Sequence, residues 1–285
     1  MVILIWMVLV ILAIVFIYIF FKDIQKHKNS LEPVSWLKTG AIGFVVNFFD
    51  VLGIGAFAPQ TALLKFTKQT SDKLIPGTMN VANTLPVLIQ AILFIQVIKV
   101  EPVTLVVMFL TATTGAMLGA GVVAKLSETR IRFIISIALL ITAGFMLANK
   151  MNWIQGEGNA IGIHGWKLVL AGSVNFILGA LMTVGVGLYA PCMALVYLLG
   201  LSPLVAFPIM MGSCAFLMPP ASIKFIRSGA YNRKAALGMA IPSIVAVLIA
   251  ALIVKSLPLG TLRWLVIVIV LYTSGTMFYS ALKKR

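Results

Sequence analysis

The stretch GIGAFAPQTAL at residues 53–63 recurs as GVGLYAPCMAL at residues 185–195. Six of the eleven aligned positions are identical, and every pair is separated by 132 residues. Weaker matches continue near this offset, so we interpret residues 40–150 and 168–282 as two copies of one unit. Because glycine and proline both interrupt helices, each block predicts a break in an apolar helical segment, with a new helix starting near the proline.

Composition indicates an integral membrane protein. Of the 285 residues, 61% are hydrophobic and 10% are charged, whereas soluble domains carry about 25% charged residues. This length provides for roughly nine or ten bilayer-crossing helices. The net charge of +15 comes from 22 Lys and Arg against 7 Asp and Glu. Since the basic residues lie singly or in small groups between apolar runs, we interpret them as loop charges that orient membrane helices, and expect no nucleic-acid partner.

Four regions are expected along the chain. Residues 1–39 form an N-terminal transmembrane anchor and a cytoplasmic loop, because an apolar run of 20 residues is followed by lysines and by no cleavage site. The first unit covers residues 40–150, an extracytoplasmic linker covers 151–167, and the second unit with the C-terminus covers 168–285. After its broken segment, each unit is predicted to contain three transmembrane helices, at 75–98, 103–124 and 131–149 and at 203–226, 235–255 and 262–282.

The basic residues decide between two topologies for the broken segments. If each segment is a re-entrant hairpin, 17 basic residues lie on the cytoplasmic side, and the other five are Lys99, Lys150, Lys167, Lys255 and Arg263. If each segment crosses once, the division is 14 to 8. The positive-inside rule favours the hairpin, with the N-terminus outside and the C-terminus in the cytoplasm. Three crossings per unit then invert the second unit relative to the first, so the predicted fold class is an all-α inverted repeat.

Inverted repeats with broken helices are typical of secondary transporters, whose substrate site lies where the breaks meet. A half-helix that starts after a break presents free backbone N–H groups and a positive dipole end, which together favour an anion. The alternative is that glycines only allow close helix packing and that polar side chains only bond neighbouring helices. The substrate-binding candidates are Gly53, Gly55, Pro59, Gln60, Thr78, Asn80, Asn83, Gly185, Gly187, Pro191, Cys192 and Ser213.

Asp50 is the acidic residue placed well inside an apolar segment, which makes it the candidate for carrying a coupling proton. The alternative is that it caps the break or pairs with a nearby lysine, and no Asp occupies the corresponding place in the second unit. The sequence contains no set of residues typical of a metal site, a cofactor site or a catalytic centre. It also lacks the P-loop that binds nucleotides, so any driving force must come from gradients or a partner.

The repeated block, followed about 20 residues later by a Gly-Thr or Gly-Ser pair, resembles the TauE/SafE family of sulfite exporters. The matching positions are Gly53, Gly55, Pro59, Gly77 and Thr78 in the first half and Gly185, Gly187, Pro191, Gly212 and Ser213 in the second. The resemblance implies transport of sulfite, sulfonates or related carboxylic anions. The chain departs from the pattern where bulkier residues replace a longer glycine run, at 56–57 and 188–189, which implies a differently shaped substrate.

The leading hypothesis is therefore a multi-pass carrier of the cell membrane that works by alternating access. Its expected partners are a small anionic substrate, the lipid bilayer, a coupling proton or sodium ion, and a second copy in a homodimer. One alternative is an anion channel with the same half-helix geometry. The other is a thiosulfate-uptake permease, because Cys192 and Cys214 lie in apolar segments, where cysteine is also ordinary packing material.

Overall fold

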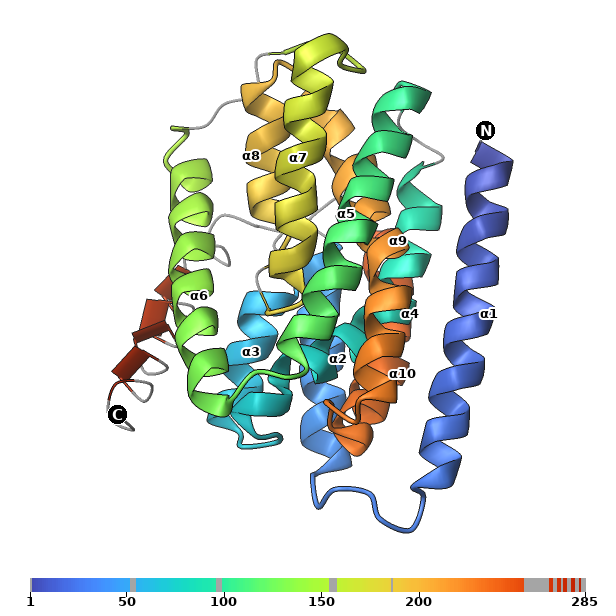
Figure 1. Cartoon of the computed structure of the whole chain (residues 1–285), viewed down its shortest axis with the longest axis vertical. Coiled ribbons are helices and arrows are strands. Elements are labelled where there is room, and N and C mark those ends of the chain that lie inside the picture. The colour runs from blue at the N-terminus through green and yellow to red at the C-terminus, as the bar shows by residue number, and fades with distance from the viewer. Residues whose placement is uncertain are drawn as a thin grey trace.

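The computed structural model is a bundle of helices (Figure 1). It describes residues 2–51, 55–95, 99–153, 158–185 and 187–253, and also 267, 268, 271, 272, 274, 275, 278, 279 and 282. No strand occurs in this described part of the chain. In chain order the helices are α1 (Val2–Lys26), α2 (Trp36–Asp50), α3 (Phe57–Phe66), the 3-10 helix η1 (Asp72–Leu74), α4 (Ile75–Ile95), α5 (Pro102–Val123), α6 (Glu128–Lys150), α7 (Gly165–Met182), α8 (Tyr189–Leu198), the 3-10 helix η2 (Pro203–Val205), α9 (Ala206–Arg227) and α10 (Arg233–Ile253).

Local sequence signals explain where several helices begin. The Ser35 hydroxyl accepts a hydrogen bond from the Lys38 amide, 3.3 Å away, and so caps α2. The Asn232 side chain accepts from the Ala235 amide at 2.8 Å and caps α10 in the same way. Pro102 stands at the first position of α5, where its missing N–H costs nothing.

Six helices of the described residues are long and apolar enough to cross a membrane. They are α1, α4 together with η1, α5, α7, α9 and α10. Helices are the expected solution in a bilayer, because a helix satisfies its own backbone hydrogen bonds where water is absent. The architecture agrees with the composition, and the protein is an all-helical membrane protein.

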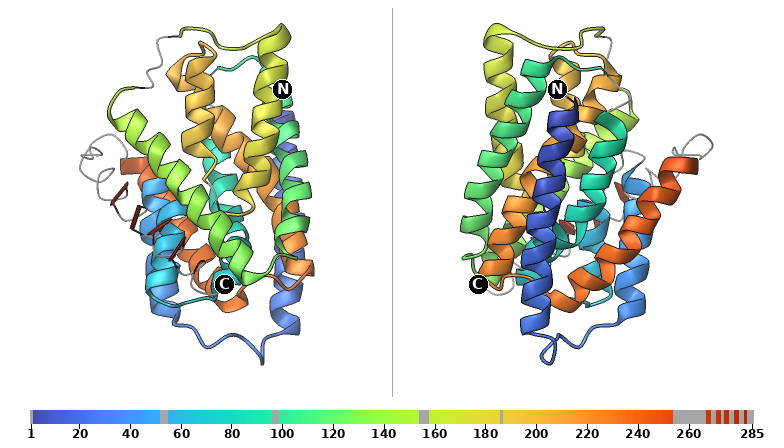
Figure 2. Two further views of the ribbon diagram at one scale, coloured as in Figure 1. Left: turned by 60° about the vertical axis from the view of Figure 1, so that its left-hand side comes forward. Right: turned by 90° about the vertical axis from the view of Figure 1, so that its right-hand side faces the viewer.

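Helices α4 and α9 form the centre of the bundle. In their most apolar windows 72% and 78% of the residues are buried, compared with 22% for α1. The two helices pack against each other, and Thr84 on α4 and Ser222 on α9 are joined by a 2.9 Å hydrogen bond. Helix α1 lies on the outside of the bundle, against α9 and α4 (Figure 2). Its exposed apolar side chains present the kind of surface that lipid covers.

Two helices are interrupted at the places that the repeated sequence blocks predict. Helices α2 and α3 occupy the lower part of Figure 1 and α8 the upper part, and α7 runs down from the upper end, so the two interrupted pairs extend from opposite ends of the bundle towards its middle. Gly55 has φ +89° and Gly185 has φ +111°, a backbone region that side chains with a Cβ rarely adopt. Gly53, which the sequence also assigned to the first break, lies outside the described residues.

Close packing between α5 and α7 depends on small residues. A Cβ atom at Gly179 would collide with the backbone carbonyl of Ala112, and one at Gly115 would collide with that of Phe176. Glycine at such crossings lets two helices approach closely in a membrane.

We expect Gly179→Ala to lower the free energy of unfolding by about 1–3 kcal/mol, because the added methyl group forces two helix backbones apart. Thermal unfolding of the protein in detergent measures the effect. The matched control is Gly144→Ala on α6, where an added Cβ meets no atom within 4 Å. Equal melting temperatures for the two variants would contradict the packing argument.

Candidate functional site

A small cavity lies where the two helix breaks meet. Its volume is about 10 Å³, which is close to the space that a single water molecule requires. The described residues that border it include Asp50, Gly55, Ala56 and Phe57 from the first break and Gly187, Leu188, Tyr189 and Cys214 from the second half. The tertiary structure therefore brings together segments that are more than 100 residues apart in the sequence. A sulfite-sized anion does not fit a cavity of this volume, so the conformation described is closed around the breaks.

Both half-helices direct their N-terminal ends at this cavity. Helix α3 begins at Phe57 and α8 begins at Tyr189, and both residues line the cavity. The first N–H groups of a helix have no partner inside the helix, so they are available to a ligand at the helix end. Pro59 and Pro191 stand in the third positions of these helices, where an N–H group would also lack a partner within the helix.

The two breaks approach each other reciprocally. A Cβ atom at Gly55 would stand 4.0 Å from the Cβ atom of Tyr189. A Cβ atom at Gly187 would stand 3.9 Å from the Cβ atom of Phe57. In the sequence repeat, Gly55 corresponds to Gly187 and Phe57 corresponds to Tyr189, so each glycine faces the aromatic residue of the other copy.

Asp50 ends α2 and is buried beside the cavity. Its carboxylate accepts a hydrogen bond from the Gln90 side-chain amide at 2.8 Å, and the Ala56 backbone amide also bonds it. The Tyr189 hydroxyl donates to the Gln90 side-chain oxygen at 2.9 Å, which connects α8 to the same group. The bond from the Ala56 amide caps the break, as one of the alternatives for Asp50 predicts, and pairing with a lysine is not observed for Asp50 among the described residues.

Sequence reasoning did not select Gln90 or Tyr189 for the site. A signal was present for Tyr189, because it introduces a hydroxyl group where the first copy of the repeat has Phe57. Gln90 is a neutral polar residue within an otherwise apolar helical segment, and nothing in the sequence distinguishes it from a residue that bonds neighbouring helices.

Two candidates of the first half, Gln60 and Asn83, lie in a buried amide network together with Asn47. The Asn47 amide on α2 donates to the Asn83 oxygen on α4 at 3.0 Å and lies 2.9 Å from the Ser243 hydroxyl on α10. The Asn83 amide in turn donates to the Gln60 oxygen on α3. The Gln60 amide donates to the sulfur of Met239 at 3.1 Å. These polar side chains join the first half-helix pair to α4 and α10.

A corresponding link joins α7 to α5 and α9. The Asn175 amide donates to the Met108 carbonyl at 2.7 Å and to the Ser213 hydroxyl at 3.1 Å. The side-chain oxygens of Asn47 and Asn175 are buried and have no hydrogen-bond partner. Asn80 also has such an oxygen, while its amide donates only to the Pro76 carbonyl of its own helix.

The remaining candidates are not among the residues that border the cavity. Thr78 lies near the end of the bundle, where it donates to the Leu74 carbonyl and accepts from the Asn232 amide at 2.9 Å. Pro191 borders a different pocket, and Cys192 is fully buried. A Cβ atom at Gly185 would stand 3.2 Å from the terminal methyl group of Met79, so this glycine packs against α4.

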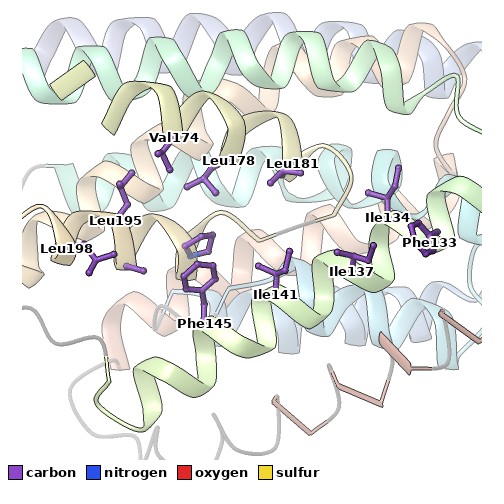
Figure 3. Close-up of a pocket in the computed structure, with 12 residues that line it drawn as sticks. Phe133, Ile134, Ile137, Ile141, Phe145, Val174, Leu178, Leu181, Leu195 and Leu198 are labelled. Carbon is purple, nitrogen blue, oxygen red and sulfur yellow. The ribbon is translucent and has the colours of Figure 1, made fainter. Parts of the chain in front are cut away.

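The pocket that Pro191 borders is apolar and has a volume of about 490 Å³. It lies between α6 and the α7–α8 pair (Figure 3). Phe133, Ile141 and Leu195 are among the twelve residues that line it, and all twelve are apolar. An oxyanion needs hydrogen-bond donors, so this pocket does not have the chemistry of an anion site.

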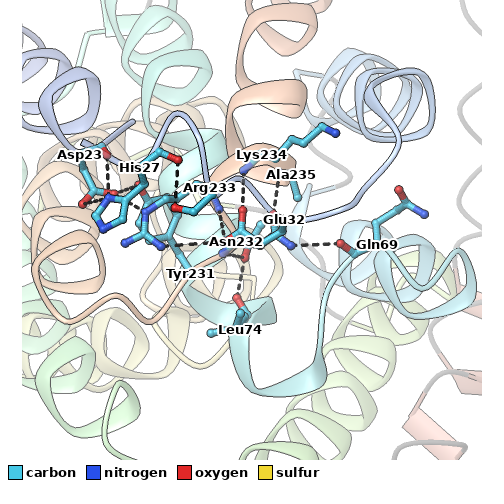
Figure 4. Close-up of polar contacts among 12 residues, drawn as sticks. Asp23, His27, Glu32, Gln69, Leu74, Tyr231, Asn232, Arg233, Lys234 and Ala235 are labelled. Atoms are coloured by element: carbon cyan, nitrogen blue, oxygen red, sulfur yellow. Dashed lines mark hydrogen bonds and ion pairs between the residues drawn. The ribbon is translucent and has the colours of Figure 1, made fainter. Parts of the chain in front are cut away.

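A polar cluster closes the end of the bundle that carries the α1–α2 loop (Figure 4). Asp23 at the end of α1 accepts from Arg233 at 2.8 Å and from the Tyr231 hydroxyl at 2.6 Å. Glu32 accepts from the backbone amides of Arg233 and Lys234, both at 3.1 Å, and so stabilises the start of α10. Burial raises the pKa of the Tyr231 phenol above its usual value, and the hydrogen bond to Asp23 raises it further.

The fold defines a multi-pass membrane protein in which two helix N-termini lie at one small central cavity. The chain matches the family Sulfite exporter TauE/SafE over residues 1–146 and over residues 72–277. It therefore belongs to the TauE/SafE family, which confirms the resemblance seen in the sequence and places it among membrane transporters. Comparisons with curated proteins and with solved structures returned no match.

Two buried asparagines of the first half provide a test of the amide network. We expect Asn47→Leu to lower the free energy of unfolding by about 1–3 kcal/mol, because it leaves the Asn83 oxygen without its donor and removes the link to Ser243. The control is Asn80→Leu, which is equally buried but breaks only a bond within its own helix. Thermal unfolding compares the two, and an equal or larger loss for Asn80→Leu would contradict the network's role.

Proposed function

We propose that this protein is a secondary transporter that moves a small sulfur-containing or carboxylic anion across the cell membrane by alternating access. The observation that carries the proposal is the convergence of two helix N-termini, those of α3 and α8, on one cavity. Two sets of free N–H groups and two positive dipole ends bind an anion without a cationic side chain. Membership of the TauE/SafE family supports sulfite or a related anion as the substrate.

The packing of the helices supports an inverted repeat. Exchanging α2 with α7, α4 with α9 and α5 with α10 maps the main contacts onto one another, because α2 packs on α10 as α7 packs on α5. Asn47 on α2 bonds residues of α4 and α10, and Asn175 on α7 bonds residues of α9 and α5. The same exchange relates these two links, so the two halves repeat their chemistry as well as their helix order.

The placement of α2, α3, α7 and α8 supports re-entrant hairpins. Helices α2 and α3 lie on the side of the bundle that carries the α1–α2 loop, and α7 and α8 lie on the opposite side (Figure 1). We assign the side with the α1–α2 loop to the cytoplasm, because most basic residues of the described chain lie there. This orientation puts the start of α1 outside, and it agrees with the sequence prediction of an outside N-terminus and a cytoplasmic C-terminus.

Transport requires that the closed cavity open to each side in turn. On the cytoplasmic side the cluster of Asp23, Glu32 and Arg233 connects α1, the α1–α2 loop and α10. The contact between the break glycines and the aromatic residues of the opposite copy closes the centre. Movement of one half relative to the other separates these contacts, in the manner of other carriers built from inverted repeats.

The position of Asp50 supports coupling to protons. Its carboxylate occupies the N-terminal end of α3 and accepts a hydrogen bond from Ala56, in the place where a substrate anion would bind. Two like charges in one small cavity repel each other strongly, because the surroundings screen them poorly. Binding of an anion is therefore favoured when Asp50 is protonated, so that one proton moves with the substrate.

Sodium is the competing coupling ion. The unpaired side-chain oxygens of Asn47 and Asn175 are acceptors that suit a cation. An anion channel with the same architecture would need neither ion. Flux measurements distinguish the two alternatives. The flux through a channel does not saturate with substrate concentration, and the flux through a sodium-coupled carrier stops when sodium is replaced by potassium.

We expect proteoliposomes containing the protein to take up labelled sulfite with saturation, and a proton gradient to accelerate the uptake. Asp50→Asn removes the titrating group but retains a hydrogen-bonding side chain, so its flux should no longer depend on the proton gradient. Gly144→Ala on α6 serves as the control variant, and its flux should match that of the unsubstituted protein. Saturable flux that is unchanged in Asp50→Asn at every pH would refute the coupling, and the absence of any anion flux would refute the transporter assignment.

The thiosulfate alternative rests on Cys214, which borders the cavity, and Cys192, which is buried nearby. If the protein binds its substrate through helix N-termini, the double variant Cys192→Ala, Cys214→Ala should retain at least about half of the sulfite flux, since alanine removes only a buried thiol. Uptake of labelled thiosulfate by the unsubstituted protein is measured in parallel. Loss of both fluxes in a variant that melts normally would favour the thiol-dependent permease.

A further inference from the structure

Two grooves run beside each other on the outside of the bundle, at the end that carries the α1–α2 loop. The first, which we call the basic groove, has a volume of about 720 Å³ and lies between the ends of α5 and α9 and the start of α6. Its basic side chains are Lys125, Arg130, Lys224 and Arg227. The second, the α1 groove, has a volume of about 630 Å³. It shares Arg227 with the basic groove and adds Lys22.

Among the side chains that the structure describes, the basic residues of the basic groove have no carboxylate partner. Asp72 at this end of the bundle already binds Lys65 and Arg132, and Asp23 and Glu32 bind Arg233. Even when Glu128 is counted, the segments 125–130 and 224–227 carry a net charge of +3.

The walls of both grooves are apolar and face the surroundings of the bundle. Leu118 and Val122 on α5 are 62% and 61% exposed, although they belong to a helix long and apolar enough to cross the membrane. Ile14 and Val15 of α1 line the α1 groove in the same way. Lys224 lines the basic groove together with these apolar residues, and its ammonium group donates a hydrogen bond to the Met117 carbonyl on α5.

We propose that the basic groove binds the phosphate headgroup of an anionic phospholipid, with an acyl chain along Leu118 and Val122. Arginine and lysine side chains donate strongly to phosphate oxygens, and basic pockets between membrane helices on the cytoplasmic side suit such headgroups. The groove combines basic side chains with exposed apolar side chains. A phospholipid has both a charged headgroup and apolar chains, so it matches this groove better than a soluble ion does. This site is distinct from the central cavity and independent of the proposed transport activity.

The test uses the full chain, purified in detergent and freed of lipid. Cardiolipin, phosphatidylglycerol, phosphatidylcholine and inorganic phosphate are added separately, and the melting temperature and the bound lipid by native mass spectrometry are measured. We expect the two anionic lipids to raise the melting temperature by about 3 °C or more, since a ligand that binds only the folded state stabilises it. Phosphatidylcholine and inorganic phosphate should leave the melting temperature unchanged. An equal shift with phosphatidylcholine or with inorganic phosphate would overturn the lipid assignment.

Two pairs of variants locate the site. Replacing Lys125, Arg130, Lys224 and Arg227 by glutamine should weaken binding of anionic lipid at least about tenfold, because each basic residue near a membrane surface contributes to the attraction. The matched control replaces four other basic residues predicted to lie on the same side by glutamine, namely Lys28, Lys38, Lys68 and Lys73. Equal weakening in the control would overturn the proposal, since it would mean that only the total charge matters.

The second pair retains every charge. Val122→Trp places a large side chain in the apolar part of the basic groove and should also weaken binding of anionic lipid. The control is Val106→Trp, which changes an exposed position of the same helix that does not line the groove. Tight binding to the Val122→Trp variant would contradict the placement of the acyl chain. This pair decides the question if the fourfold glutamine variant does not fold.

Discussion

The structure depends on one constraint, namely that backbone N–H and C=O groups inside a bilayer must find partners within the protein. Most of the chain meets it with long helices, and the two breaks are the exceptions. At these breaks the protein brings α3 and α8 together, end to end, at a closed cavity. Asp50, Gln90 and Tyr189 supply a chain of hydrogen bonds there that links the two halves. The proposed anion site is therefore also the place where the fold leaves backbone groups without partners inside a helix.

The centre of the bundle is the part that keeps this arrangement together. Helices α4 and α9 are largely buried, and polar side chains bond α4 to α2 and α9 to α7, each within its own half. Glycines at the α5–α7 crossing bring those backbones close, and Gly43 on α2 similarly faces Met239 on α10. Interhelical bonds in membranes contribute modestly one by one, so packing and polar links act together. The α5–α7 and α2–α10 crossings join one half to the other, so a movement that opens the contacts between the breaks would also have to change these crossings.

Much of the helix order was predictable. The predicted crossing at 75–98 corresponds to α4, the one at 103–124 to α5, the one at 131–149 to α6, and those at 203–226 and 235–255 to α9 and α10. The predicted crossing at 262–282 falls largely outside the described residues. The site was less predictable. Gly55, Gly187 and Asp50 border the cavity, whereas Thr78 lies at the end of the bundle and Pro191 borders an apolar pocket.

The sequence by itself determined that the protein lies in a membrane, that it is helical and that it is interrupted at two related places. These properties follow from composition, from apolar run length and from the local effects of glycine and proline, which act within a few residues. Only the tertiary structure decided which polar groups meet, because the contact of Tyr189 with Gln90 joins residues 99 positions apart. A polar side chain on a membrane helix can meet any of several neighbouring helices. Which of them supplies its hydrogen-bond partner depends on how those helices pack.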